Sequence, residues 1–134
     1  MIRVMRAGTT YVVAIFAAGF VLGVLRTLVL VPLLGALRAV LVELPIILTI
    51  AWLVCAPILR RWPLSSSEAV WMGAVAFSIL MLAEASLSYL LAGRNLAEHL
   101  GLYAELSHQF GLAGQFAFAV FPWIQVRRSN APSD

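Results

Sequence analysis

Four long apolar runs, each broken from the next by polar or turn-forming residues, organise the chain. They cover residues 10–31, 39–59, 69–92 and 110–126. A helix rises about 1.5 Å per residue and the hydrocarbon core of a bilayer is roughly 30 Å thick, so about 20 apolar residues make one crossing. The pattern predicts an all-α, polytopic membrane protein in which residues 1–134 form a single transmembrane four-helix bundle.

Local signals mark two of the boundaries between these runs. Pro32 and Gly35 predict a break and a tight corner after the first run, which makes the first two helices antiparallel neighbours. Ser65 and Glu68 have the spacing of a capping box and directly precede the third apolar run. The third helix is therefore expected to have a capped start.

The connection between the third and fourth runs is the only one long enough to hold structure of its own. Four apolar side chains there recur at helical spacing: Leu96, Leu100, Tyr103 and Leu106. The charged residues of this segment mostly fall off that stripe, as they do in a helix lying on a membrane surface. We expect a short outer-side interfacial helix between helices three and four.

Composition and charge agree with the membrane class. Hydrophobic residues make up 63% of the chain and charged residues 11%, a balance foreign to soluble domains. The basic residues are all arginine and stand at or near helix ends, so the lipid bilayer is the expected partner and nucleic acid is not. The single cysteine, Cys55, lies in an apolar run and cannot by itself build a disulfide or a metal site.

The arginines also predict an orientation. Six of them flank one side of the predicted spans, Arg3, Arg6, Arg60, Arg61, Arg127 and Arg128, whereas Arg38 and Arg94 occupy the other side. Three tryptophans that suit a membrane interface fall on the arginine-rich side: Trp62, Trp71 and Trp123. Basic residues collect in the cytoplasm, so both termini are expected there.

Arg26 and Glu43 stand inside apolar runs, where a charge needs a partner. Each lies about five residues from the outer end of its span, so both are roughly 8 Å deep in the same half of the membrane. Their helices are predicted to be antiparallel neighbours. We therefore expect an ion pair between Arg26 and Glu43.

Glu84 and Gln115 add one strongly polar side chain from each of the other two spans. One arginine cannot neutralise two carboxylates unless a proton is shared or Arg38 reaches inward, so Glu84 is expected to hold a proton at neutral pH. Arg26, Glu43, Glu84 and Gln115 form the predicted buried polar cluster. It is either a structural clasp that fixes helix register or a site for an ion, a proton or a solute.

Gly19 and Gly23 form a GxxxG pattern, and Arg26 follows on the same helical face. Such a pattern allows two helix backbones to approach closely. We expect these glycines to pack against another helix of the same chain or against a second subunit, with Arg26 pointing into protein.

Other candidates for chemistry are weaker. Glu98, Glu105 and His108 fall on one side of a helix and could gather a metal, but solvated loop polarity is the better interpretation. Ser86 and Ser88 lie near Glu84, and no histidine or lysine stands where it could activate them. No catalytic residue, metal site or cofactor is therefore expected.

Three short patterns in the first two spans carry a resemblance to a known group. These are GxxR at Gly23 and Arg26, PxxG at Pro32 and Gly35, and ExP at Glu43 and Pro45. The chain resembles small uncharacterised four-helix inner-membrane proteins of proteobacteria. The resemblance implies a location in the bacterial inner membrane and implies no activity.

Two classes of function follow. The first is a non-enzymatic protein that works through helix contacts, as an accessory or assembly subunit or as a homo-oligomer, with other membrane-protein subunits or further copies of itself as partners. The second is a small transporter or channel that uses Glu84, Arg26 and Glu43 to bind a proton, an ion or a solute. A lipid-modifying membrane enzyme is a distant third.

Overall fold

The computed structural model describes residues 1–132, and within that range the chain is helical, with no strand. The first helical rod joins α1 (Ile2–Leu25), the π-helical turn η1 (Arg26–Leu30) and α2 (Val31–Leu34). Then follow α3 (Ala36–Arg61), α4 (Ser66–Ala92), α5 (Leu96–Gly101), the 3-10 turn η2 (Leu102–Ala104) and α6 (Leu106–Ser129).

Three of these stretches are long and apolar enough to cross a membrane, which indicates a membrane protein. They are Ile2–Leu34, Ala36–Arg61 and Ser66–Ala92. The expected fourth span falls within α6, which has 24 residues but is less apolar than the other three. Glutamines at positions 109, 115 and 125 account for part of that difference.

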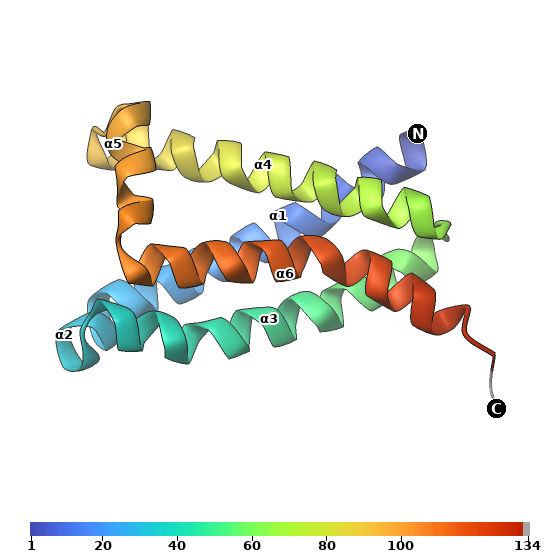
Figure 1. Cartoon of the computed structure of the whole chain (residues 1–134), viewed down its shortest axis with the longest axis horizontal. Helices are drawn as coiled ribbons and strands as arrows, with labels where there is room; N and C mark the ends of the chain where they lie inside the picture. The colour runs from blue at the N-terminus through green and yellow to red at the C-terminus, as the bar shows by residue number, and fades with distance from the viewer. Residues whose placement is uncertain (133–134) are drawn as a thin grey trace.

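The four long rods form a bundle in which each contacts two others (Figure 1). α1 packs against α3 and α4, and α6 packs against the same two helices from the opposite side. The two chain termini and the α3–α4 connection lie at one end, which we call the terminus end. α2 and α5 lie at the other, which we call the cavity end.

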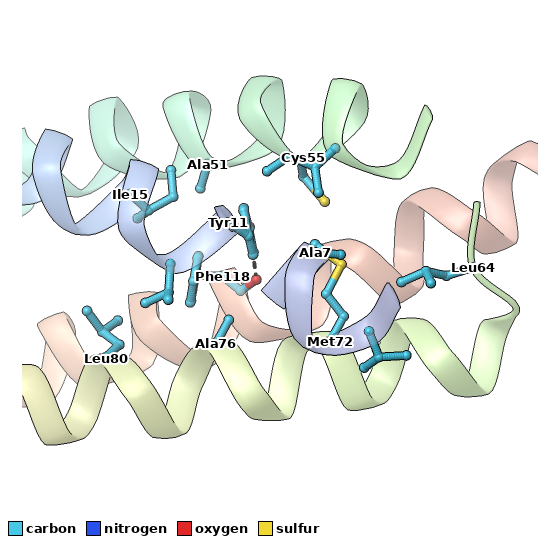
Figure 2. Close-up of a cluster of buried hydrophobic side chains, with 13 residues drawn as sticks. Ala7, Tyr11, Ile15, Ala51, Cys55, Leu64, Met72, Ala76, Leu80 and Phe118 are labelled. Carbon is cyan, nitrogen blue, oxygen red and sulfur yellow. Dashed lines mark hydrogen bonds between the residues drawn. The ribbon is translucent and has the colours of Figure 1, made fainter. Parts of the chain in front are cut away.

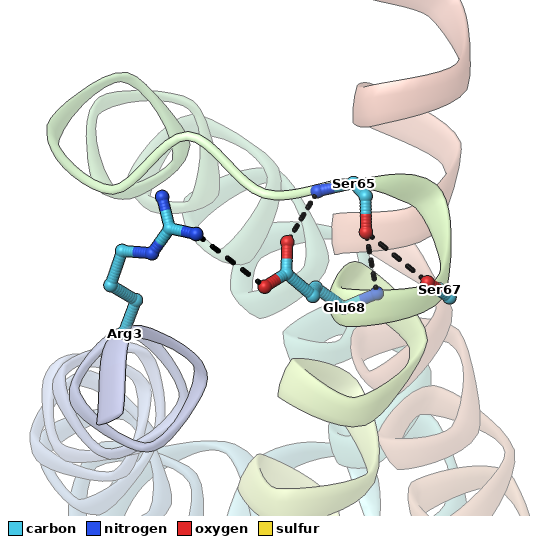
Figure 3. A network of polar contacts seen from close by, with 4 residues as sticks. All are labelled: Arg3, Ser65, Ser67 and Glu68. Atoms are coloured by element: carbon cyan, nitrogen blue, oxygen red, sulfur yellow. Dashed lines mark hydrogen bonds and ion pairs between the residues drawn. The ribbon is translucent and has the colours of Figure 1, made fainter. Parts of the chain in front are cut away.

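The start of α4 is capped as the sequence predicts. The Ser65 side chain accepts a hydrogen bond from the Glu68 backbone N–H, and the Glu68 carboxylate accepts one from the Ser65 N–H at 2.9 Å (Figure 3). Arg3 lies 3.7 Å from the same carboxylate and links the start of α1 to the start of α4. These contacts fix the terminus end of the bundle.

The corner between the first two rods is made by Gly35 alone, whose φ of 82° suits a residue without a side chain. Pro32 does not break the helix, contrary to the expectation that the first span ends near residue 31, because helix continues to Leu34. The π-turn η1 directly precedes α2, in which Pro32 is the second residue. Proline has no N–H to give the preceding turn, and a local change in hydrogen-bond pattern accommodates that loss.

The segment before α6 is not one continuous helix. α5 ends at Gly101, η2 follows, and Glu105 has an extended backbone with ψ of 137°. The spacing predicts that Leu106 shares a helical face with Leu96 and Leu100. Leu106 instead begins α6, so it does not belong to that face. A second capping box, between Asn95 and Glu98, starts α5.

The apolar core fills the terminus half of the bundle. Tyr11, Met72 and Cys55 are fully buried there (Figure 2). The Tyr11 ring stacks on Phe118 with ring centres 4.4 Å apart, and its hydroxyl donates a hydrogen bond to the Phe118 carbonyl over 3.1 Å. Pro122, four residues later, has no N–H for that carbonyl. Tyr11 therefore supplies the donor that the helix itself lacks.

The glycines that allow close helix approach are not the predicted pair, Gly19 and Gly23. Gly73 of α4 lies directly against the Ala119 backbone of α6, and a Cβ at Gly8 of α1 would stand 3.1 Å from the Met72 carbonyl. By contrast, no backbone of another helix lies within 4 Å of the Cβ position at Gly19 or Gly23. The GxxxG pattern is therefore not a tight seam within this chain.

Candidate functional site

Burial is unequal along the bundle. The buried residues of α1 end at Ile15 and those of α4 end at Leu80, although both helices continue for several turns. η1 and α2 contain no buried residue. α3 and α6 stay in contact further toward the cavity end, where Leu44 packs against Gly114. The bundle is thus solid in one half and hollow in the other.

The hollow half contains a cavity of about 670 Å³. α1, η1, α3, α4 and α6 form its walls, and side chains of α5 and η2 cover its end. Ile15, Ala51 and Phe118, which belong to the buried core, form its floor. This volume is typical of a site for one small ligand.

Arg26 and Glu43 form the predicted ion pair on one wall. Arg26 Nε lies 2.7 Å from Glu43 Oε2, and the side chains are 36% and 15% exposed. The Nε–H is not directed at the carboxylate and has no hydrogen-bond acceptor. The contact is therefore an ion pair that joins η1 to α3 and leaves one donor of the guanidinium unused.

Glu84 and Gln115 form a second polar pair on the opposite wall. Gln115 Nε2 donates a hydrogen bond to Glu84 Oε1 over 2.7 Å and joins α6 to α4. Arg26 lies near enough to act electrostatically on Glu84, as do His99 and His108. The four predicted cluster residues therefore face one cavity from four different helical elements.

The end of the cavity is lined by aromatic and titratable side chains that sequence reasoning set aside. Tyr103 stands between His99 and His108, with ring centres 5.8 and 6.4 Å from its own. Burial, together with the nearby Glu84 carboxylate, raises the pKa of the Tyr103 phenol. All three rings line the cavity. In the sequence Tyr103 belonged to the predicted apolar stripe and His108 to the weak metal-ligand candidates, and neither pattern indicated a shared cavity.

Four side-chain polar atoms in the described part of the chain are buried without a hydrogen-bond partner: Arg26 Nε, Ser88 Oγ, His99 Nδ1 and Gln115 Oε1. Every one of these residues lines the cavity. Buried polar groups in folded proteins nearly always have partners, and exceptions concentrate at binding sites. These atoms are covered in the structure, so a molecule that enters the cavity pairs with them only after their side chains rotate toward it.

The four residues of the predicted buried polar cluster are only partly buried. None of the charged or polar residues described by the structure is fully buried, and Arg26, Glu43, Glu84 and Gln115 are each partly exposed. They are exposed to the cavity, whose wall also includes Gly19 and Gly23. These two glycines make no close helix contact within the chain and leave space beside Arg26, and their packing against a second subunit stays a prediction.

The three residues weighed as metal ligands, Glu98, Glu105 and His108, do not come together as a group. Glu98 caps the start of α5, while the Glu105 carboxylate lies 3.4 Å from His108 Nδ1. No group of three potential metal ligands occurs among residues 1–132.

Comparison with known proteins assigns the chain to no family. The chain matches no protein-family model, no curated protein sequence and no solved structure.

Proposed function

We propose that this chain is a small integral membrane protein that binds a small solute in the cavity between its two polar pairs. The observation that carries the proposal is the location of three polar atoms that have neither a hydrogen bond nor an ion pair, Ser88 Oγ, His99 Nδ1 and Gln115 Oε1, on residues that all line one cavity. A role in transport of that solute follows if the site opens alternately to the two sides. The predicted residues Glu84, Arg26 and Glu43 then form the polar part of the binding site.

The membrane arrangement is part of the same proposal. α6 is taken as a fourth span, because 24 residues reach about 36 Å as a helix and its arginines stand only in the last turn. The arginine bias and the tryptophans support a terminus end in the cytoplasm and a cavity in the outer half. α5 and η2 then lie at the outer interface. The bacterial inner membrane follows from the resemblance in the first two spans.

A cavity-filling variant tests the binding function. Gly23→Leu adds a side chain beside Arg26, and its Cβ would stand 3.8 Å from Arg26 Nη2, an ordinary contact. Native mass spectrometry of the protein extracted from its membrane should show a bound small molecule that Gly23→Leu loses. Ala17→Leu is the matched control, because Ala17 lies on the same helix, is exposed and does not line the cavity. Equal occupancy in all three proteins, or none in any, contradicts the proposal.

The helix-contact function expected from the sequence is the second candidate. It is supported by the two polar pairs, because each joins neighbouring helices, η1 to α3 and α4 to α6. Such pairs can fix helix register without binding anything. If the protein is an accessory subunit or a homo-oligomer, extraction in a mild detergent should recover it with a partner or with further copies. A monomer without partners would count against this role.

A further inference from the structure

The position of the cavity opening narrows the class of solute, provided that the cavity is the binding site proposed above. α1 contacts α4 at the terminus end, where Gly8 meets Met72 and Val75. Toward the cavity end the first rod leaves α4, since η1 and α2 pack against α1 and α3 and not against α4 or α6. Figure 1 shows this diagonal course from the α4 side of the bundle toward the start of α3. The two walls therefore separate along their cavity halves.

Apolar side chains line this separation on both sides. Phe20 and Val24 of α1 and Leu91 of α4 belong to the cavity wall and are 51%, 42% and 74% exposed. In a membrane-spanning helix such exposed apolar side chains face hydrocarbon. The end of the cavity is covered by Tyr103, His99 and other residues of the α5 to α6 segment. The open side of the cavity thus faces lipid, and its covered end faces the interface.

The polar groups inside define the head of a ligand. The Arg26 charge is balanced by Glu43, whose Oε2 lies 2.7 Å from Arg26 Nε, so this pair needs no further ionic partner. The Gln115 amide oxygen can only accept a hydrogen bond, whereas the Ser88 hydroxyl can donate or accept one. Glu84 and Arg94, one residue of each charge sign, also line the cavity, so its formal charges balance. A complementary head therefore carries its own donors and acceptors and no net charge.

We propose that the solute is an uncharged amphipathic lipid with a hydroxyl-bearing head, which enters from the bilayer through the gap between α1 and α4. Its head lies among Ser88, Gln115 and Arg26, and its hydrocarbon part lies in the gap against Phe20 and Leu91.

Photolabelling in phosphatidylcholine vesicles tests the ligand class. The first probe is a monoacylglycerol with a photoreactive diazirine in its chain. The second is a lysophosphatidic acid with the same chain, which is anionic, and the third is a water-soluble photoreactive diol. Peptide mass spectrometry after illumination locates the labelled residues. The monoacylglycerol should label α1 and α4 residues of the cavity wall, several-fold less in Gly23→Leu and equally in Ala17→Leu.

Ser88→Ala is a second variant in case the larger side chain at position 23 disturbs folding, because it removes one hydroxyl and adds no volume. It should also lower labelling by the monoacylglycerol. Stronger cavity labelling by the anionic lipid overturns the uncharged head, and labelling by the diol alone overturns the lipid assignment. Either result leaves the binding function standing. Labelling confined to lipid-facing residues and unchanged by Gly23→Leu and Ser88→Ala overturns both.

Discussion

Tyr11 of α1 donates a hydrogen bond to the carbonyl of Phe118 in α6, the one carbonyl in that turn that Pro122 leaves without a donor. The two rings also stack, and Phe118 forms part of the cavity floor. Tyr11→Phe keeps the stacking and removes the donor. We expect it to lower the free energy of unfolding by about 1–2 kcal/mol. Thermal unfolding in detergent measures this, and a value unchanged from the parent protein would show that the hydrogen bond has no net worth.

The contact of Gly73 with the Ala119 backbone predicts a strong response to one added methyl group. Gly73→Ala forces α4 and α6 apart, because the new Cβ meets main chain that cannot rotate away, and it should cost at least about 2–3 kcal/mol. Gly111→Ala in α6 is the matched control, since nothing lies within 4 Å of its Cβ position. It should be neutral or stabilise by up to about 1 kcal/mol through helix propensity. Similar melting temperatures for the two variants would contradict the predicted α4–α6 contact.

The Arg26–Glu43 pair should show coupling in a double-mutant cycle. Arg26→Ala or Glu43→Ala alone leaves a partly buried charge without its partner, and each should cost about 1–3 kcal/mol, less than for a fully buried pair. The double variant should lose about 1 kcal/mol less stability than the two single variants lose together. Arg94→Ala is a control, because Arg94 is exposed. Strictly additive losses would mean that the two side chains do not interact in the membrane.

Two substitutions at Glu84 separate the role of its hydrogen bond with Gln115 from the role of its charge. Glu84→Gln keeps the size and an acceptor for Gln115, so its stability should stay within about 1 kcal/mol of the parent. Glu84→Ala leaves the Gln115 donor unpaired and should lose about 1–3 kcal/mol. Unfolding in detergent compares the three proteins.

The same substitution also tests a coupling role for Glu84. In a proton-coupled transporter, Glu84→Gln should abolish pH-dependent flux in liposomes, because the amide does not titrate. Unchanged flux would exclude Glu84 as the coupling group and leave its hydrogen-bonding role intact.

Sequence reasoning predicted the features that depend on local spacing. The capping box at Ser65 and Glu68 spans three residues, and the corner at Gly35 follows from its backbone freedom. The pair of Arg26 and Glu43 could be predicted because a short corner makes their helices antiparallel, which fixes their relative depth. In these cases the separation of two residues along the chain nearly determines their separation in space.

The cavity could not be predicted in this way. It exists because the first rod diverges from α4 after Ile15. The tilt of a helix is set by contacts between residues far apart in the chain, such as the hydrogen bond between Tyr11 and Phe118. The same tilt explains why Gly19 and Gly23 line open space while the isolated Gly8 and Gly73 make the close contacts. A motif indicates that close approach is possible, whereas the global packing decides where it occurs.

The central claim, a hollow half that opens to lipid, can be tested most directly with a nitroxide at position 88. Ser88→Cys in a Cys55→Ala background is labelled, reconstituted in vesicles and compared with Ala76→Cys in the buried core. The account predicts that the label at position 88 is mobile and is relaxed more strongly by oxygen, which dissolves in lipid, than by a water-soluble nickel complex. A label at position 88 that is as immobile and as inaccessible to oxygen as the one at position 76 would contradict it.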